Sequence, residues 1–386
     1  MKIKVADPIT GADEIARVAE VIRSGNFVSG KTVVEFERRF ADWVGVRHCV
    51  AVNSGTAALQ AALAAVDVGP GDEVIVPPLT FFSTIMAVMQ QGAIPVFCDI
   101  SRDTYCMDAA GIAAAMTPNV KAVVPVHYFG HVADVRAIAL EAKRAGGRKI
   151  ATIEDAAQAH GSAINGETVG AIGDAGCYSF FATKHMTTGE GGAVTTNDDA
   201  IANYCRTFRS HGMHGRNDHL MMGYNYRMSE LNAAIGLAQM DKIEDLNARR
   251  IAICQELTRR LADIDWITLP KIPNNIRHTY FWMHIEVDEE KLGMSTQDLI
   301  RKLGENGVEV RHRYVEPLYK QPVLNENLPR QVRDVVTERG ISYKDISMPN
   351  VEAVVSRLLG LPNRPNLSTE EMDYIVKTLK GLGPQG

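Results

Sequence analysis

Short continuous apolar runs alternate with helical stretches through the first 200 residues, and no other feature constrains the fold as strongly. Each run is bounded by Pro, Gly or Asp; the runs are HCVAVNSG, DEVIVPP, AIPVFCDI, KAVVPVHYFG and KIATIEDAA. Runs of this kind are typical of strands that are buried on both faces. The sequence therefore predicts an α/β fold in which a mainly parallel sheet is covered by helices.

Segments whose apolar residues have helical spacing lie before and between these runs. A first helix can end at Gly25, a second is expected over Thr32 to Trp43, and the small-residue segment TAALQAALAAV predicts another. From Ser229 to about Ala262 the spacing predicts one long helix that leads into a second unit. We therefore expect a large domain over 1–245 and a smaller α+β domain over 246–386.

The C-terminal part contains both strand-like and helix-like patterns. Strands are expected over TYFWMHIEV and GVEVRHRY, with a helix from Ser295 to Asn306 before the second. The last helix is expected to begin after Ser368, because Glu371 stands at capping-box spacing from it. The segment KQPVLNENLPRQVRD is expected to be an exposed excursion.

Charge and composition exclude several classes of protein. The net charge of −5 is well mixed and shows no basic stripe, which argues against nucleic-acid binding. The start, MKIKVADPITG, has no signal-peptide pattern, and no apolar run approaches the roughly 20 residues of a membrane span. Six scattered cysteines favour reduced thiols, so a cytoplasmic protein without a metal site is expected.

Four strand ends carry residues with possible chemistry. In VNSGTAAL, Gly55 allows a tight turn and Thr56 begins a helix, so the free amides could bind a phosphate; an ordinary capped helix is the alternative. No phosphate loop of the GxxxxGK[ST] type and no GxGxxG after a strand occurs. In PPLTFFSTI, Phe81 could offer a flat surface to a ring, although such aromatic residues usually belong to the core.

The third and fourth strand ends carry charged residues. In IEDAAQAHG, Asp155 follows a buried strand, where a carboxylate needs a cation or hydrogen-bond donors, and Gln158 could reach the same ligand; helix capping is the alternative. In SFFATKHMTTGEGGAV, Lys184 could be a reactive amine with a lowered pKa, and Ser179 could bind phosphate; a surface hairpin is the alternative. Together the four ends match the needs of pyridoxal 5′-phosphate.

The chain resembles the DegT/DnrJ/EryC1/StrS family of sugar aminotransferases, which have the fold of type-I pyridoxal phosphate enzymes. The resemblance covers nearly the whole chain, and its most specific motifs are NSGTAAL, IEDAAQAHGS, SFFATKHMTTGEGG and GYNYRMSELNAAIGLAQ. It implies a mixed seven-stranded sheet in the large domain and a homodimer with active sites shared between subunits.

The resemblance also implies roles for individual residues. Lys184 would bind the cofactor covalently and move the proton, Asp155 would pair with the pyridine nitrogen, and Gln158 would contact the ring hydroxyl. Phe81 would stack on the ring, and the phosphate would be held by Gly55, Thr56, Ser179 and, from the partner subunit's copy of the chain, Asn225.

The resemblance implies L-glutamate as amino donor, with 2-oxoglutarate as its product, and a keto or aldehyde sugar as acceptor. A nucleotide-linked sugar for lipopolysaccharide or another amino-sugar polymer is expected. Arg311, Arg313 and His211 are the candidate substrate residues. The arginines could bind a nucleotide diphosphate, the glutamate carboxylate or the carboxylate of an unlinked sugar acid such as an oxidised 3-deoxy-octulosonate; a pair of surface arginines is the alternative. A non-catalytic cofactor-binding regulator and a dehydratase are the alternatives from other classes.

Overall fold

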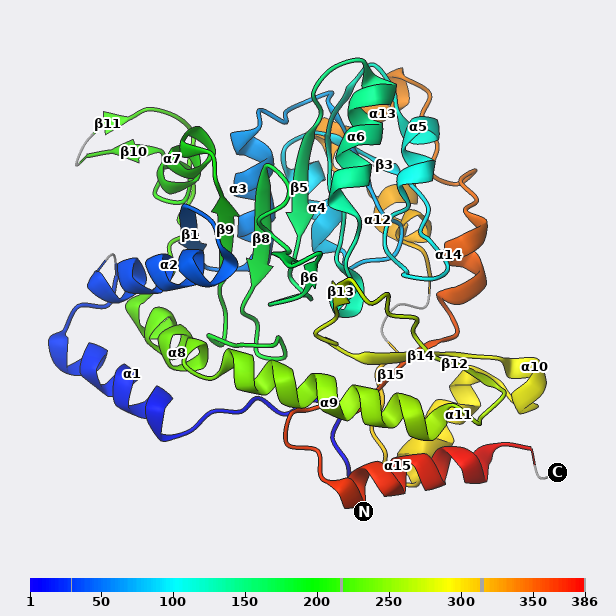
Figure 1. Ribbon diagram of the computed structural model, residues 1–386. Helices are drawn as coiled ribbons and strands as arrows, with labels where there is room; N and C mark the ends of the chain where they lie inside the picture. Colours follow the sequence, from blue (N-terminus) through cyan, green and yellow to red (C-terminus); the bar gives the residue numbers. More distant parts are fainter. Residues whose placement is uncertain (29, 216–217, 313–315, 385–386) are drawn as a thin grey trace.

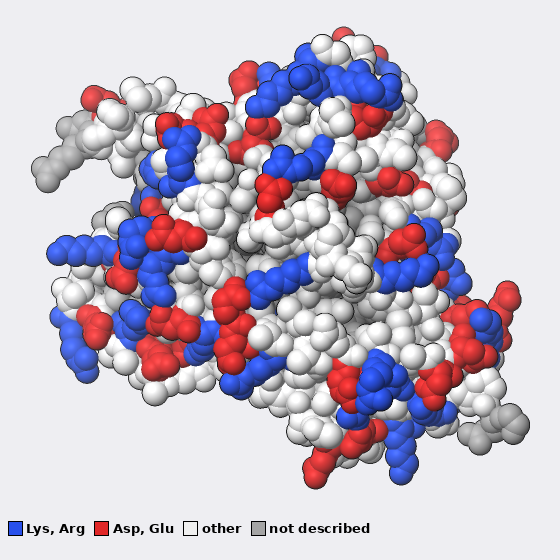
Figure 2. Space-filling view, viewed as in Figure 1, with Lys and Arg blue, Asp and Glu red and all other residues white. Residues whose placement is uncertain are grey.

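The protein is described by a computed structural model that covers residues 1–28, 30–215, 218–312 and 316–384. Figure 1 shows a central sheet with helices on both faces, and a second layer of helices that crosses below the sheet. On the face drawn in Figure 2, charges of both signs are interspersed, with a basic cluster at the C-terminal end of α6 (Val135–Gly146), where Lys143 and Arg144 lie.

The central sheet has seven strands and is mixed but mainly parallel, as the sequence predicted. Their order is β1-β9-β8-β5-β4-β2-β3. Pairing is parallel from β3 across to β8, whereas β9 runs antiparallel to both β8 and β1. The strands are β1 (His48–Val52), β2 (Glu73–Val76), β3 (Ile94–Phe97), β4 (Val120–Val123), β5 (Ala151–Asp155), β8 (Ala175–Ser179) and β9 (Gly192–Thr196).

Helices cover both faces of this sheet. One face carries α3 (Gly55–Ala65), α4 (Ser83–Gln90) and α7 (Asp199–Phe208); the other carries α2 (Lys31–Val44), α5 (Ile112–Ala115) and α6. Outside α2 lie α1 (Ala12–Ser24) and α8 (Glu230–Met240). Helix α3 is built largely from alanine, and small side chains allow it to lie close to the centre of the sheet.

A second apolar core lies below the sheet. It is formed by the antiparallel strands β12 (Ile267–Thr268), β14 (Met283–Val287) and β15 (Leu358–Leu361), which pack against α9 (Ile243–Leu261), α11 (Thr296–Glu305) and α15 (Thr369–Leu382). Helix α15 begins with the predicted capping box between Ser368 and Glu371. The division at residue 245 stays a prediction.

Short elements complete the chain. The strands are β6 (Ala163–Ile164), β7 (Glu167–Thr168), β13 (Ile276–Arg277) and the hairpin β10 (Met213–His214) with β11 (Asp218–His219). The helices are η1 (Ala109–Gly111), η2 (Tyr128–Gly130), α10 (Glu289–Leu292), η3 (Leu318–Lys320), α12 (Pro322–Asn325), α13 (Arg330–Glu338) and α14 (Pro349–Val354).

Three local predictions were wrong. The long helix from Ser229 is two helices, because the chain leaves helical geometry at Lys242 (φ −128°, ψ −2°) between α8 and α9. The segment expected to be exposed forms α12 and the start of α13, and it buries Leu324 and Val332 against the sheet's core. No strand forms within 307–312, where Val308 and Arg311 make isolated bridges to Ile3 and Gly360; positions 313 and 314 of the predicted strand lie outside the described residues.

None of the described helices is long and apolar enough to cross a bilayer. The six cysteines are all buried and unpaired. Among the described residues, no group of three or more His, Cys, Asp or Glu side chains is arranged to hold a metal ion.

A buried carboxylate stabilises the strand that leads into the site. Glu154 on β5 is fully buried and accepts hydrogen bonds from the backbone N–H groups of Gly170 (2.8 Å), Ile172 (2.8 Å) and Gly173 (2.7 Å). His127 donates to it through Nε2 at 3.0 Å, because its Nδ1 accepts from the backbone of Ala133. The carboxylate is therefore fully satisfied.

We expect E154Q to lower the free energy of unfolding by about 3 kcal/mol, because an amide N–H₂ would face a backbone N–H and the His127 Nε2–H. The urea midpoint of tryptophan fluorescence measures this. The control is E167Q, whose half-exposed carboxylate pairs with Arg136, a surface ion pair whose loss should leave the midpoint almost unchanged. Equal midpoints for the two variants would contradict the role given to Glu154.

Candidate active site

The first turn of α3 forms one wall of the site. Ser54 caps the helix, accepting a hydrogen bond from Ala57 N at 3.1 Å through its hydroxyl oxygen. The first amides of a helix have no partner within the helix, so Gly55 and Thr56 direct N–H groups toward the carboxyl ends of the strands. This end of α3 can bind an anion.

Gly55 and the end of β8 approach too closely for any side chain. A Cβ atom on Gly55 would lie 2.7 Å from the Cβ of Ser179, a distance that real Cβ atoms do not show. The Ser179 hydroxyl is thereby held beside the first turn of α3, on the same wall of the cavity. Glycine at position 55 is thus required by packing as well as by the turn.

Asp155 ends β5 as a buried carboxylate, only 4% exposed. Its oxygens accept hydrogen bonds from the Thr84 hydroxyl (2.8 Å) and from Ala157 N (3.1 Å). Burial raises the pKa of Asp155, while these two hydrogen bonds and the charges of Lys184 and His127 act in the opposite direction. A bound cation would relieve the cost of ionising it.

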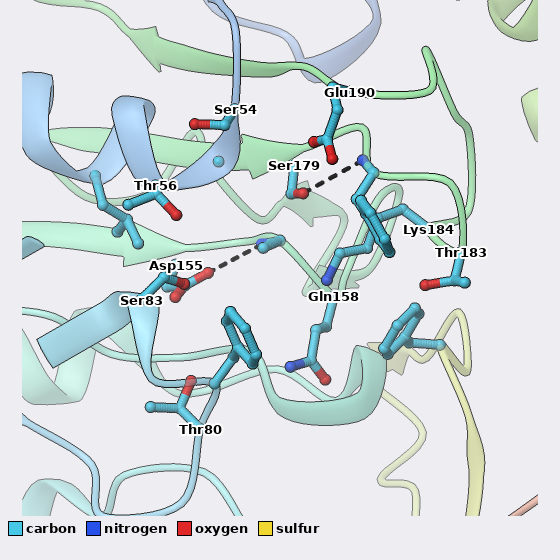
Figure 3. A pocket seen from close by; sticks show the side chains of 16 residues that line it. Ser54, Thr56, Thr80, Ser83, Asp155, Gln158, Ser179, Thr183, Lys184 and Glu190 are labelled. Carbon is cyan, nitrogen blue, oxygen red and sulfur yellow. Dashed lines mark hydrogen bonds between the residues drawn. The ribbon is translucent and has the colours of Figure 1, made fainter. Parts of the chain in front are cut away.

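Lys184 and Gln158 face the same cavity. Lys184 N donates to Phe181 O (2.9 Å) in the turn after β8, and its Nζ lies 4.6 Å from the ring centroid of Phe281. The Gln158 side-chain oxygen accepts from Phe129 N at 3.1 Å, so only its N–H₂ end can donate hydrogen bonds. Figure 3 shows both side chains in the cavity, with Ser54, Thr56 and Ser179 across from Thr80.

The cavity has a volume of about 430 Å³, the size of a small-molecule site. All the predicted cofactor residues except Asn225 line it: Gly55, Thr56, Phe81, Asp155, Gln158, Ser179 and Lys184. Helix amides and hydroxyls suit a phosphate, Asp155 suits a protonated ring nitrogen, and Lys184 suits an aldehyde. The residues present therefore fit pyridoxal phosphate.

The other predicted residues lie elsewhere. Asn225 does not line the described cavity, and its backbone oxygen accepts from Asn53 Nδ2 at 3.3 Å. His211 has a left-handed backbone (φ 59°) and lies near the hairpin β10–β11, which projects from the body in Figure 1. Arg311 pairs with Glu309 at 3.4 Å, and Arg313 lies outside the described residues. Their substrate roles stay predictions.

Several lining residues were missed from the sequence. Ser54, Thr183 and Glu190 are neighbours of the motifs and could have been included with them. Thr80 lines the cavity, and its hydroxyl lies 3.1 Å from that of Thr84, which donates to Asp155; the four-residue spacing of the two threonines was visible, but Asp155 is distant in the sequence. Phe281 comes from the other half of the chain and carries no local signal.

A seven-stranded mixed sheet with Lys184 and Asp155 facing one cavity defines a type-I pyridoxal phosphate fold. Residues 8–380 match the model of the DegT/DnrJ/EryC1/StrS aminotransferase family, to which this chain belongs. The family is pyridoxal phosphate-dependent and includes sugar aminotransferases.

Two kinds of relatives agree with this assignment. The chain is 35% identical to the spore coat polysaccharide biosynthesis protein SpsC of Bacillus subtilis (strain 168), over 97% of this chain and 95% of SpsC. Its structure is similar to that of S. venezuelae DesV in complex with a ketimine intermediate (TM-score 0.87, 30% identity, 97% and 95% of the chains). It is also similar to the PMP form of the putative sugar aminotransferase Spr1654 from Streptococcus pneumoniae (TM-score 0.87, 27% identity, 99% and 98%).

We expect G55A to weaken cofactor binding at least about tenfold, because the added methyl group must displace Ser179 or the first turn of α3. Titration of the cofactor-free protein with pyridoxal phosphate, followed by absorbance, measures this. G69A is the matched control, since a Cβ atom there meets nothing within 4 Å. Unchanged binding by G55A would show that the first turn of α3 does not hold the phosphate.

We expect D155N to lower the transamination rate without lowering the stability of the cofactor-free protein at pH 8. Because the folded pKa of Asp155 is raised, its contribution to stability is present at acid pH and is lost as the pH rises through that pKa. Cofactor-free D155N should therefore melt no lower than the unsubstituted protein at pH 8. Each kcal/mol added to the free energy of unfolding would raise the melting temperature by about 1 °C. Its transamination rate should fall at least about 100-fold, because the ring nitrogen loses its anionic partner.

Melting of the cofactor-free proteins at pH 5 and pH 8, together with single-turnover rates of the loaded proteins, tests both halves of this expectation. A D155N protein that is fully active, or that melts well below the unsubstituted protein at pH 8, would contradict it.

Proposed function

We propose that this protein is a pyridoxal phosphate-dependent aminotransferase that moves an amino group from L-glutamate to a keto or aldehyde sugar. The observation that carries this proposal is that Lys184, Asp155 and the first turn of α3 all line one cavity. A nucleotide-linked keto-deoxysugar used for a cell-surface polysaccharide is the proposed acceptor. The similarity to SpsC, which is named for polysaccharide biosynthesis, supports that choice.

Each residue has one proposed task. The bound cofactor supplies an electron sink for the bond that breaks at the donor carbon. Lys184 holds the cofactor and then moves a proton to and from the reacting carbon. Asp155 keeps a proton on the ring nitrogen, and Gln158 donates to the ring hydroxyl. Phe81, which is half-exposed at the cavity wall, covers the ring.

We also propose a homodimer in which Asn225 completes the phosphate site of the other subunit. Large apolar side chains are exposed close to it along the chain: Leu220 (67%), Met222 (87%) and Tyr224 (41%). Phe27 and Val28 are exposed as well, and Val28 bridges to Ser229 just beyond the same segment. A second copy of the chain would cover this surface.

His211, Arg311 and Arg313 stay candidates for sugar recognition, and a sugar acid stays the second class of acceptor. The cytoplasmic location also stays a prediction.

The test mixes protein in its pyridoxamine phosphate form with keto-sugar nucleotides and, separately, keto-sugar acids. The expected result is recovery of the aldehyde-form absorbance with one class, together with an amino sugar identified by mass spectrometry. K184A should lower the rate at least about 1000-fold, because it removes the group that transfers the proton. Water loss without nitrogen transfer, or transfer by K184A at the unsubstituted rate, would overturn the proposal.

A further inference from the structure

A second, smaller cavity lies on the other side of Lys184. Its volume is about 40 Å³, enough for a carboxylate group or a water molecule. It shares Thr183, Lys184 and Phe281 with the large cavity. Its remaining walls come from Val5–Pro8, from α9, and from the chain after β15. Lys184 therefore stands between the two cavities.

Arg250 on α9 is the unusual residue of this small cavity. It is only 8% exposed, yet its one hydrogen bond to a described residue is to the Asn247 side-chain oxygen, at 2.9 Å. No described carboxylate lies within ion-pair distance of its guanidinium group. Burial lowers the pKa of Arg250 to about 10, which still leaves it charged at neutral pH. A buried guanidinium without an anion is costly and requires an explanation.

The other charged groups of the cavity already have partners. The Arg364 guanidinium pairs with Glu371, and Asp7 pairs with Lys4 at 3.5 Å, close to solvent. Asn363 donates to Tyr280 O at 2.6 Å. Asn247, which orients Arg250, is itself fixed by donating to His160 O at 3.0 Å. Arg250 is thus held in place beside the reactive lysine with its positive charge uncompensated.

We infer that Arg250 binds the α-carboxylate of the amino donor, and of the 2-oxo acid product, in this small cavity. The inference rests on the proposed function and assigns a donor site within it. The transferred nitrogen and the α-carboxylate are attached to the same carbon, so the carboxylate must lie close to the group that acts on that carbon. A planar guanidinium group suits a carboxylate because it can donate two parallel hydrogen bonds.

This site would let the protein select amino donors that carry a carboxylate. An amino acid and its 2-oxo acid both neutralise Arg250, whereas an uncharged amine leaves the buried cation unpaired. Specificity against donors that lack the carboxylate follows from that penalty.

The test compares R250Q with R249Q in the cofactor-loaded protein. Arg249 is the neighbouring residue on α9; it is 59% exposed and pairs with Asp245, so it is a matched control for loss of one positive charge. The probe is glutarate, a dicarboxylate that has no amine to transfer, and its binding is measured by calorimetry. We expect R250Q to weaken glutarate binding 10- to 100-fold, about 1.4 to 2.8 kcal/mol, and R249Q to leave it unchanged.

A second measurement separates binding from folding. In single turnovers, R250Q should raise the L-glutamate concentration needed for half-maximal rate by a similar factor, while the cofactor absorbance and the rate with the keto sugar stay the same. If R250Q does not fold, R250K, which keeps the charge but loses the paired hydrogen bonds, should still weaken glutarate binding relative to R249Q.

Glutarate binding by R250Q that equals that of R249Q would overturn the inference, as would failure of the unsubstituted protein to bind glutarate at all. An Arg250-dependent glutarate site in a protein that aminates no sugar would instead overturn the proposed function and leave the carboxylate site standing.

Discussion

The close packing of α3 against the centre of the sheet is the constraint on which the site depends. Gly55 contacts Ser179, and Gly192 at the start of β9 has no room for a Cβ atom beside the Ser54 carbonyl. These contacts place the amino end of one helix directly over the carboxyl ends of strands, where free N–H groups and strand-end side chains meet. Larger side chains on α3 would move its first turn, with the free N–H groups, away from Asp155 and Lys184.

Two neighbouring carboxylates on β5 show how one strand serves both stability and function. Glu154 points toward three backbone N–H groups and His127, and it has no capacity left for a ligand. Asp155 points toward the cavity and receives two hydrogen bonds, from Thr84 and Ala157. Alternation along the strand produces this difference, since successive side chains face opposite sides. The incompletely satisfied carboxylate is therefore the one available to a cationic ring.

The sequence predicted the layers and most of the residues that line the large cavity because both depend on local patterns. Continuous apolar runs indicate buried strands, and Gly55, Asp155 and Lys184 each follow such a run directly. Residues that reach the site through tertiary packing could not be found in this way, since Phe281 and Arg250 stand in segments without a motif. The break at Lys242 and the burial of Leu324 were missed for the same reason: each is decided by which core the segment packs against.

Lys184 lies between a cavity whose residues fit a phosphorylated ring and a smaller cavity lined by Arg250, whose guanidinium group has no carboxylate partner among the described residues. The two anions of the proposed reaction, the cofactor's phosphate and the donor's carboxylate, would then lie on different sides of the amine. A nucleotide-linked keto sugar, which brings no carboxylate to Arg250, would be recognised by other residues of the large cavity. If Arg250 binds the donor as proposed, the cost of burying its charge selects donors that carry an anionic group.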